Sequence, residues 1–143
     1  MNDTGGSTPG ELDVDAYGGD AFGDLATSMG IEIIEATAQR VVARMPVKDN
    51  TQPYGILHGG ASCVLAETIG SIGSALHAGP DRVTMGIELN ASHHRSVSEG
   101  HVTGVATQLH GGRTLTSYEI VITDDRDRRI CTVRLTCVLR DKP

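Results

Sequence analysis

Residues 50–80, NTQPYGILHGGASCVLAETIGSIGSALHAGP, are the most informative part of the sequence for predicting the fold. Its second part predicts one long helix from Gly59 to about His77. Apolar side chains recur there at the i+4 and i+3 spacing of a single helical stripe, namely Ala61, Leu65, Ile69, Ile72 and Leu76. Gly79-Pro80 is a typical signal for the end of a helix. The residues before the helix, from Pro46 to Leu57, contain Pro53 and Gly55 and predict a loop.

Glu67 is the only Asp, Glu, Lys or Arg in this stretch. The helix face that contains it is otherwise small and uncharged, consisting of Gly60, Cys63, Ser71 and Ser74. A solvent-facing helix surface normally carries several charges, so this face predicts a cleft or a subunit contact. A carboxylate in a poorly solvated cleft can act as a base or a nucleophile.

His58-Gly59-Gly60 stands where the predicted helix begins. Free N–H groups and the positive end of the helix dipole at that position favour a developing oxyanion, and glycine lets a carbonyl group approach the backbone. Glu67 is about 12 Å further along the helix axis, at ~1.5 Å per residue. One helix therefore cannot place Glu67 beside the Gly59 amide, whereas a second subunit can bridge the gap.

The flanking sequence predicts β-strands. Two short strands, at 31–35 and 38–45, precede the helix, and four follow it, at 83–93, 101–109, 115–123 and 130–139. In the first of these four, alternation predicts one face formed by Val83, Met85, Ile87, Leu89 and Ala91. The result is an α+β domain with an antiparallel sheet and one long helix. A single helix cannot cover both faces of the sheet, so we expect the other face or an edge to mediate self-association.

The N-terminal residues contribute little to this domain. Residues 1–19 are rich in Gly, Asp, Ser and Thr and predict a flexible tail, and the domain occupies residues 20–143. A short helix is expected over 20–29, ending at Gly30.

Composition excludes several classes of protein. A net charge of −6 argues against nucleic acid as a partner. Cys63, Cys131 and Cys137 are an odd number without CxxC spacing, so we expect free thiols rather than a disulfide framework or a zinc site. No apolar run is long enough to span a membrane, and the N-terminus does not resemble a signal peptide. We therefore expect a cytoplasmic protein without a membrane partner.

Two motifs carry a resemblance to a known family. QPYGILHGGAS (residues 52–62) followed by LAETIGS (65–71) resembles the hotdog-fold acyl-CoA thioesterases that use a glutamate on the helix. The later segments NASHHRS (90–96) and Glu99-Gly100 match the same pattern, and the resemblance covers roughly residues 20–140. Within the family, the chain looks most similar to the 1,4-dihydroxy-2-naphthoyl-CoA hydrolases of menaquinone synthesis, which are related to phenylacetate-pathway and 4-hydroxybenzoyl-CoA thioesterases.

The resemblance implies a hotdog fold, in which the sheet wraps around the central helix. It also implies dimers with active sites at the interface, commonly assembled to tetramers, and no metal or redox cofactor. Transferred to this chain, Glu67 is the nucleophile or general base, the Gly59 amide polarises the thioester carbonyl, and Ser71 orients the water. Gln52 and His58 position the substrate, while Gly60 and His93 are expected to contact it.

Coenzyme A also carries phosphates, which need local cations in an acidic chain. Arg95 and Arg113 are the best candidates, and the turn around Arg113 adds His110, Gly112 and Thr114 as expected contacts.

Other interpretations of these residues stay open. Gln52 is also compatible with a simple loop position, His58 with a helix cap, Ser71 with packing, and both arginines with solvated surface sites. For the whole chain, the alternatives are a hydratase on the same fold and a non-catalytic acyl-CoA sensor. A serine hydrolase is disfavoured because residues 60–64 do not match GxSxG, and Cys63 has no histidine at helical spacing to activate it as a nucleophile.

Overall fold

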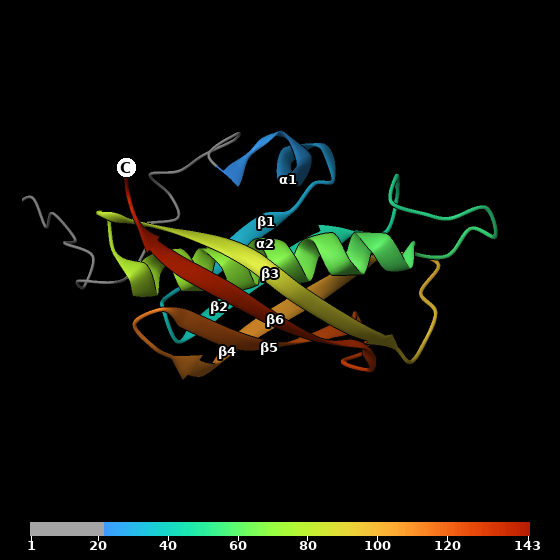
Figure 1. Cartoon of the computed structure of the whole chain (residues 1–143). Coiled ribbons are helices and arrows are strands. Elements are labelled where there is room, and N and C mark those ends of the chain that lie inside the picture. Colours follow the sequence, from blue (N-terminus) through green and yellow to red (C-terminus); the bar gives the residue numbers. More distant parts are fainter. Residues whose placement is uncertain (1–21) are drawn as a thin grey trace, which may run out of the picture.

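The computed structural model describes residues 22–143, and the predicted tail therefore lies outside the described residues. Two strands, one long helix and four further strands follow one another in the order predicted from the sequence, and Figure 1 shows how they are arranged. The elements in chain order are α1 (Asp24–Ser28), β1 (Glu32–Ala36), β2 (Arg40–Pro46), α2 (Gly59–Ala78), β3 (Arg82–His93), β4 (His101–Gly111), β5 (Leu115–Asp124) and β6 (Arg129–Asp141). Within residues 22–143, no helix is long and apolar enough to cross a membrane.

The six strands form one antiparallel sheet in the order β1-β2-β4-β5-β6-β3. The hairpin before α2 and the four strands after it thus join into a single layer, because β2 pairs with β4. Helix α2 runs along one face of this curved sheet (Figure 1). Strands β1 and β3 are its edges, so α2 leads directly into an edge strand.

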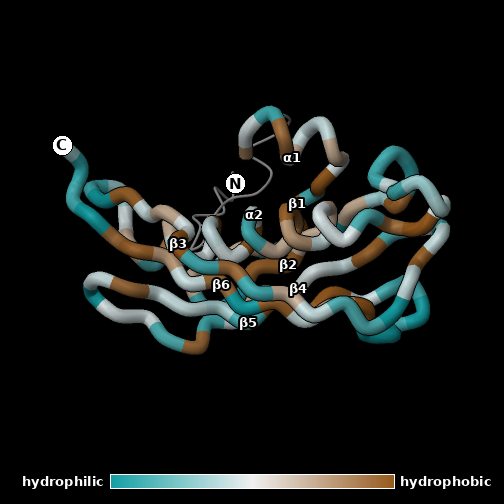
Figure 2. Tube along the Cα trace, turned by 45° about the vertical axis from the view of Figure 1, so that its right-hand side comes forward, coloured by the Kyte–Doolittle hydropathy of each residue, from teal (hydrophilic) through white to brown (hydrophobic). Residues whose placement is uncertain are grey.

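The core lies between α2 and the inner face of the sheet, where the brown, hydrophobic segments of Figure 2 gather. Leu65 and Ile69 from the predicted helical stripe are fully buried. The first half of the stripe is confirmed by its burial, whereas Ile72 and Leu76 are only partly buried against the core. Full burial of one such side chain contributes about 1.5–3 kcal/mol, so this stripe fixes the rotation of α2.

Strand β3 corrects the predicted alternation. The pairing with β6 shifts between Gly86 and Glu88, which leaves Ile87 as an extra residue in a bulge. A bulge reverses which side chains point inward. Before it, Met85 lies on the outer face and is exposed, whereas after it Leu89 and Ala91 pack against the core. The prediction that all five apolar residues share one face is therefore wrong.

Each of the two described helices is followed by a glycine with positive φ at its C-terminal end. Gly30 follows α1 with φ +72°, and its neighbour Ile31 donates its N–H to the carbonyl of Ala26, so the helix stops there as predicted. Gly79 follows α2 with φ +84° and donates to the carbonyl of Ala75. Of the helix predicted over 20–29, residues 20 and 21 lie outside the described residues, and within the remainder α1 covers only Asp24–Ser28.

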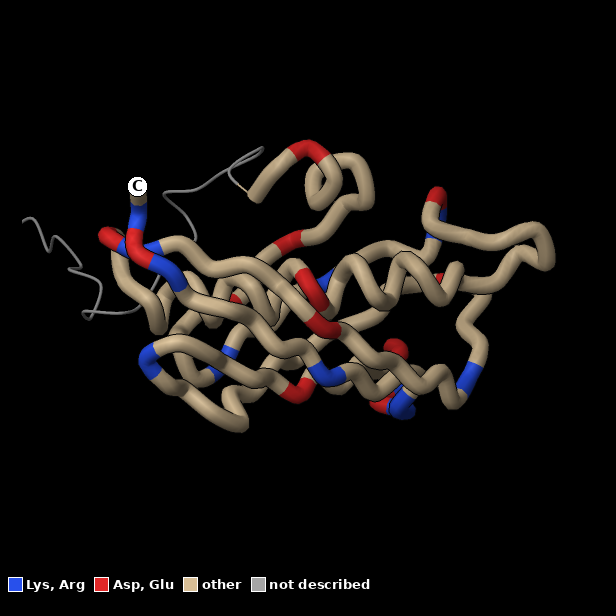
Figure 3. The backbone as a smooth tube through the Cα atoms, viewed as in Figure 1, with Lys and Arg blue, Asp and Glu red and all other residues tan. Residues whose placement is uncertain are grey.

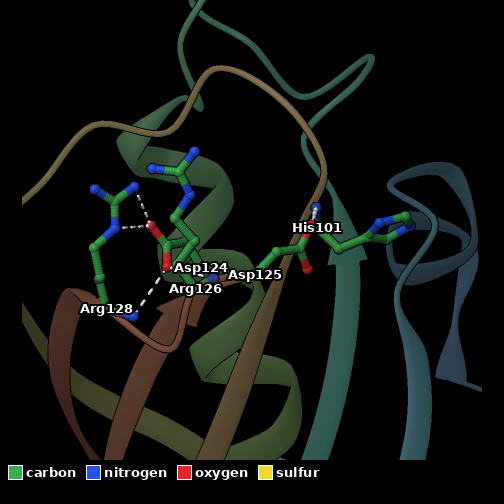
Figure 4. A network of polar contacts seen from close by, with 5 residues as sticks. All are labelled: His101, Asp124, Asp125, Arg126 and Arg128. Carbon is green, nitrogen blue, oxygen red and sulfur yellow. Dashed lines mark hydrogen bonds and ion pairs between the residues drawn. The ribbon is translucent and has the colours of Figure 1, made fainter.

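The β5–β6 turn is organised by a buried carboxylate (Figure 4). Asp124 accepts the backbone N–H groups of Arg126 and Arg128, both at 2.9 Å, and pairs with the Arg128 guanidinium at 2.7 Å. Burial opposes ionisation of Asp124, but the donors from Arg128 and Arg126 outweigh it and hold the pKa of the carboxyl below its ordinary value. Asp125 then accepts the N–H of His101 at 3.0 Å and ties the turn to β4.

This turn generates a prediction about stability and pH. A carboxyl with a lowered pKa in the folded state stabilises the fold above its ordinary pKa of about 3.9, and this stabilisation is lost as pH falls through the lower folded-state value. Asp124→Asn should therefore lower the urea midpoint at pH 7. The difference in urea midpoint between Asp124→Asn and the parent should become smaller as the pH drops below about 4. Urea titrations at a series of pH values measure both effects, and a constant difference across pH would contradict the electrostatic explanation.

Candidate active site

The loop before α2 is a tight hairpin rather than an open segment. Thr51 and Leu57 form a β-bridge, and the turn is closed by Gly55 N–H donating to the carbonyl of Gln52 at 2.9 Å. Gly55 has φ +79°, which glycine adopts without strain. The side-chain oxygen of Gln52 accepts the N–H of Tyr54. The side-chain NH₂ of Gln52 has no acceptor in the described part of the chain, and the residue lines a pocket.

His58 is the N-cap of α2. Its Nδ1 accepts the N–H of Gly60 at 2.8 Å, which confirms the capping interpretation of this residue. The Gly60 N–H is thereby occupied and does not bond a ligand. Gly60 can assist binding only because, without a side chain, it lets a ligand approach the backbone closely. The Gly59 N–H, in contrast, has no hydrogen-bond acceptor among residues 22–143. The cap thus leaves one amide available at the positive end of the helix dipole.

His93 lies against Gly59. A Cβ atom added at Gly59 would come within 2.9 Å of the His93 Nε2, so only glycine permits this approach. The register of β3 explains the position: His93 pairs with buried Cys131, and both therefore belong to the inner side of the sheet. His93, which the resemblance predicts as a substrate contact, is thus placed at the start of α2.

A pocket of about 400 Å³ opens at this end of α2. It is lined by the loop, the helix start, the segment after β3 and the start of β6, with the residues Gln52, Ile56, Leu57, Gly59, Ser62, His93, His94, Arg95, Ser96, Val97 and Ile130. Four of the predicted site residues, Gln52, Gly59, His93 and Arg95, therefore meet at one pocket. His94 lines the pocket as well, although neighbouring residues of a strand point to opposite faces, because β3 ends at His93.

Glu67 lies outside the pocket. It is exposed in the single chain, two turns along α2 from Gly59, and its carboxylate rests on β3 beside Gly86. A Cβ at Gly86 would be 2.9 Å from the Glu67 Oε1. Figure 3 shows the helix across the middle of the molecule in tan with a red segment, and Glu67 is the only charged residue of α2. The carboxylate therefore has no competing charge on its own helix.

The two serines of the predicted Glu67 face differ in their burial. Ser71, one turn beyond Glu67, is half-buried. Ser74, on the same side of α2, is instead fully buried, and its hydroxyl bonds to Thr84 at 2.6 Å and to Thr116 at 2.7 Å. Burial and, to a smaller extent, the Glu67 carboxylate raise the pKa of the Cys63 thiol. A thiol kept protonated is a poor nucleophile, which strengthens the case against Cys63.

The predicted phosphate contacts fall at two opposite ends of the molecule. Arg95 is at the pocket, whereas the turn with His110, Gly112, Arg113 and Thr114 is at the C-terminal end of α2 (Figure 1). His77, near the last turn of α2, bonds through Nε2 to the Gly112 carbonyl at 2.8 Å. At ~1.5 Å per residue this turn is about 27 Å from Gly59 along the axis. One chain therefore does not bring the two sets together.

Comparison with known proteins places this geometry in a family. Residues 54–131 match the model described as "Thioesterase superfamily". The chain belongs to this superfamily. It is a hotdog-fold thioester hydrolase. A proofreading thioesterase of Cronobacter turicensis is 44% identical over 126 residues, which cover 87% of this chain and 92% of that protein.

Solved structures agree with the family assignment. A variant of a Pseudomonas aeruginosa thioesterase with one glutamine changed to alanine superimposes with a TM-score of 0.86 at 33% identity, covering 92% of this thioesterase and 96% of that chain. A Staphylococcus aureus thioesterase, also with a glutamine changed to alanine, gives a TM-score of 0.79 at 35% identity and covers 81% and 98%. The same S. aureus protein has also been solved with a glutamate changed to alanine.

The sequence analysis of this thioesterase missed two residues, one that contacts Glu67 and one that lines the pocket. Gly86 supports Glu67 only because of the bulge, and strand alternation gave no signal for that irregularity. Ser62 lines the pocket although the helical pattern marked only its neighbours. Its position one turn after Gly59 on the same side of α2 was the available signal.

The contact between Gly86 and Glu67 generates a prediction. In Gly86→Ala the new methyl group would displace the flexible end of Glu67 rather than the backbone. Misplacing a reacting group by about 1 Å can lower a rate ~100-fold, so kcat should fall 10- to 100-fold while KM changes little. Steady-state kinetics with any accepted thioester measures this, and circular dichroism checks the fold. An unchanged kcat would show that Glu67 leaves Gly86 during turnover.

Proposed function

We propose that this thioesterase hydrolyses acyl-CoA thioesters to a free acid and coenzyme A, with an aryl-CoA such as 1,4-dihydroxy-2-naphthoyl-CoA as its substrate. Its place would then be in the cytoplasm, in menaquinone biosynthesis. The proposal includes active sites formed between two copies of the chain in a dimer, with two dimers associating to a tetramer.

The unoccupied N–H of Gly59 is the observation that carries the proposal. It lies at the start of a 20-residue helix, beside the pocket, and the cap on His58 takes up the neighbouring amide instead. A thioester carbonyl that accepts this N–H would be polarised, and the negative charge that develops on its oxygen during attack would be stabilised. Loss of one such donor typically costs 100- to 1,000-fold in rate.

The position of Glu67 supports a site shared between subunits. About 12 Å of helix separates it from Gly59, too far for both to act on one carbonyl carbon. A second copy would supply its own Glu67 at the Gly59 end of the first. The free edge of β3 is suited to this association, because it belongs to the strand beside Glu67 and exposes Met85 and Ile87.

The same association would bring in the remaining cations. Arg113 is distant from the pocket of its own chain, and a neighbouring copy would carry it toward the phosphates of a bound coenzyme A. Arg95 is already at the pocket, and no carboxylate pairs with it in the part of the chain that the structure describes.

The chemical step follows from these roles. As a general base, Glu67 takes a proton from a water molecule oriented by Ser71, and the water oxygen bonds to the carbonyl carbon. The intermediate, held by the Gly59 N–H, then breaks its C–S bond, and the proton passes to the sulfur of coenzyme A. As a nucleophile, the Glu67 carboxylate would instead bond to the carbonyl carbon and expel coenzyme A as its thiolate, forming a mixed anhydride. Water would then hydrolyse the anhydride to the free acid and the regenerated carboxylate, and the proton released would pass to the thiolate. Gln52 positions the carbonyl in both versions.

A spacing in a related structure supports the paired roles of Gln52 and Glu67. The glutamine and the glutamate changed to alanine in the two S. aureus structures stand fifteen residues apart, as do Gln52 and Glu67. The pocket also suits a compact acyl group, because Leu57 and Ile130 give it a buried apolar floor.

Replacement of the carboxylate tests the catalytic role. Glu67→Gln should lower kcat about 1,000-fold or more with little change in KM, as expected when a catalytic group is lost. Thiol release is measured on 1,4-dihydroxy-2-naphthoyl-, benzoyl-, phenylacetyl- and medium-chain acyl-CoA. Glu32→Gln, an exposed carboxylate on the opposite edge strand, is the matched control and should behave like the parent. Binding without hydrolysis by the parent would favour the non-catalytic sensor instead.

Complementation tests the shared site. Gln52→Ala and Glu67→Gln each inactivate every site in their own homodimers. A mixed dimer, however, has one site with both defects and one site with neither. Co-expressed variants should recover about a quarter of the parent activity, because half of randomly formed dimers are mixed and each has one intact site. Absence of recovery in mixed dimers isolated with two affinity tags would locate the whole site within one chain.

A further inference from the structure

Ser62 is a buried hydroxyl without a partner. It is 2% exposed, and its side chain makes no hydrogen bond within residues 22–143. Every fully sealed side-chain nitrogen or oxygen in that range does have a partner. The Ser62 oxygen is therefore open to a space, and the pocket that Ser62 lines is that space.

The pocket has two chemically different ends. Around Ser62 the wall is apolar and buried, with Leu57 at 9% and Ile130 at 3% exposure. At the opening, His94, Arg95 and Ser96 are exposed and polar. A ligand with one apolar and one anionic end would therefore place its apolar end on the floor, where Ser62 offers the only hydroxyl among the lining residues there.

The spacing along α2 relates this hydroxyl to the reacting carbonyl. Gly59 and Ser62 are three residues apart, so they lie on the same side of the helix, separated by about 4.5 Å along its axis. A thioester whose carbonyl accepts the Gly59 N–H can extend its acyl group into the floor alongside α2. A polar substituent on that acyl group would come within reach of the Ser62 oxygen.

The cost of an unpaired hydroxyl makes this arrangement selective. A polar group desolvated against apolar walls loses free energy unless the bound molecule supplies a hydrogen bond. An unsubstituted acyl group would leave the hydroxyl unpaired, whereas a hydroxylated one would satisfy it. Sites built to bond a substrate hydroxyl discriminate against the analogue that lacks it.

We propose that Ser62 determines substrate specificity by hydrogen-bonding a hydroxyl or carbonyl substituent on the acyl part of the thioester. The enzyme then prefers hydroxylated aryl groups to unsubstituted ones. The placement of the carbonyl at Gly59 rests on the proposed function.

The test compares Ser62→Ala with the parent on benzoyl-CoA and on its 2-, 3- and 4-hydroxy isomers. For the preferred hydroxy isomer, kcat/KM should fall roughly tenfold, as expected for loss of one buried hydrogen bond. For benzoyl-CoA it should change less than about twofold. The thioesters differ in intrinsic reactivity. This difference cancels when the ratio of kcat/KM for the hydroxy isomer to kcat/KM for benzoyl-CoA is compared between Ser62→Ala and the parent.

Ser74→Ala is the matched control, because Ser74 is an equally buried serine of α2 whose hydroxyl bonds to Thr84 and Thr116 instead of lining the pocket. It should lower thermal stability and leave the ratio between hydroxylated and unsubstituted substrates unchanged. If Ser62→Ala lowers kcat/KM for all four thioesters equally, Ser62 is a packing residue and the proposal is overturned.

A binding measurement separates this proposal from the proposed function. Calorimetry on Glu67→Gln, with and without Ser62→Ala, gives Kd for the same thioesters in the absence of turnover. A selective loss of affinity for the hydroxy isomer supports the role of Ser62 even if the parent hydrolyses none of them, in which case only the proposed function fails. If Glu67→Gln with Ser62 intact binds the hydroxy isomers no more tightly than benzoyl-CoA, the role of Ser62 is overturned.

Discussion

The close packing of α2 on the sheet is the constraint on which the rest of the structure depends. Glycines make it possible: a Cβ at Gly70 would lie 2.6 Å from Leu135, and one at Gly73 would lie 2.8 Å from the ring of Tyr118. Gly104 plays the same part from the sheet side, against Ile69. With the helix held at this distance, its start is fixed beside the end of β3 and its middle beside the bulge. Core packing thus determines the positions of Gly59 and Glu67, the two residues of α2 that are proposed to act on the substrate.

This packing also separates the two positions permanently. A straight helix cannot shorten the ~12 Å between them, and its apolar stripe prevents it from sliding or turning. The chain therefore holds two incomplete halves. One has the free amide, the pocket and Arg95, and the other has a lone carboxylate on an uncharged helix face next to an open strand edge. Each half lacks what the other supplies, which is the physical reason to expect the halves to meet across a pair of chains.

The fold was largely predictable because its main signals are periodic. The apolar stripe of α2, its stop at Gly79 and the number and order of the strands all follow from side-chain spacing. For the candidate site, the sequence predicted residues that the fold brings together at one pocket, namely Gln52, Gly59, His93 and Arg95. The catalytic role of Glu67 stays a prediction. The failures arose where contacts with neighbouring strands, which spacing along one element does not reveal, decide a residue's position. The bulge at Ile87 reverses the faces of β3, and a hydroxyl cluster places Ser74 in the core although its spacing groups it with Glu67.

The division of polarity within the pocket extends the argument from catalysis to selectivity. A thioester of coenzyme A is an apolar acyl group joined to an anionic carrier, and the pocket runs from a buried apolar floor to an exposed rim with Arg95. In the proposed function, the rim contacts only the coenzyme A part that all such substrates share, so it contributes affinity without choosing among them. Choice must come from the floor, where water is excluded and a single unpaired hydroxyl has a large effect on binding. In the proposed function, the Gly59 amide then acts on whichever carbonyl the floor has accepted.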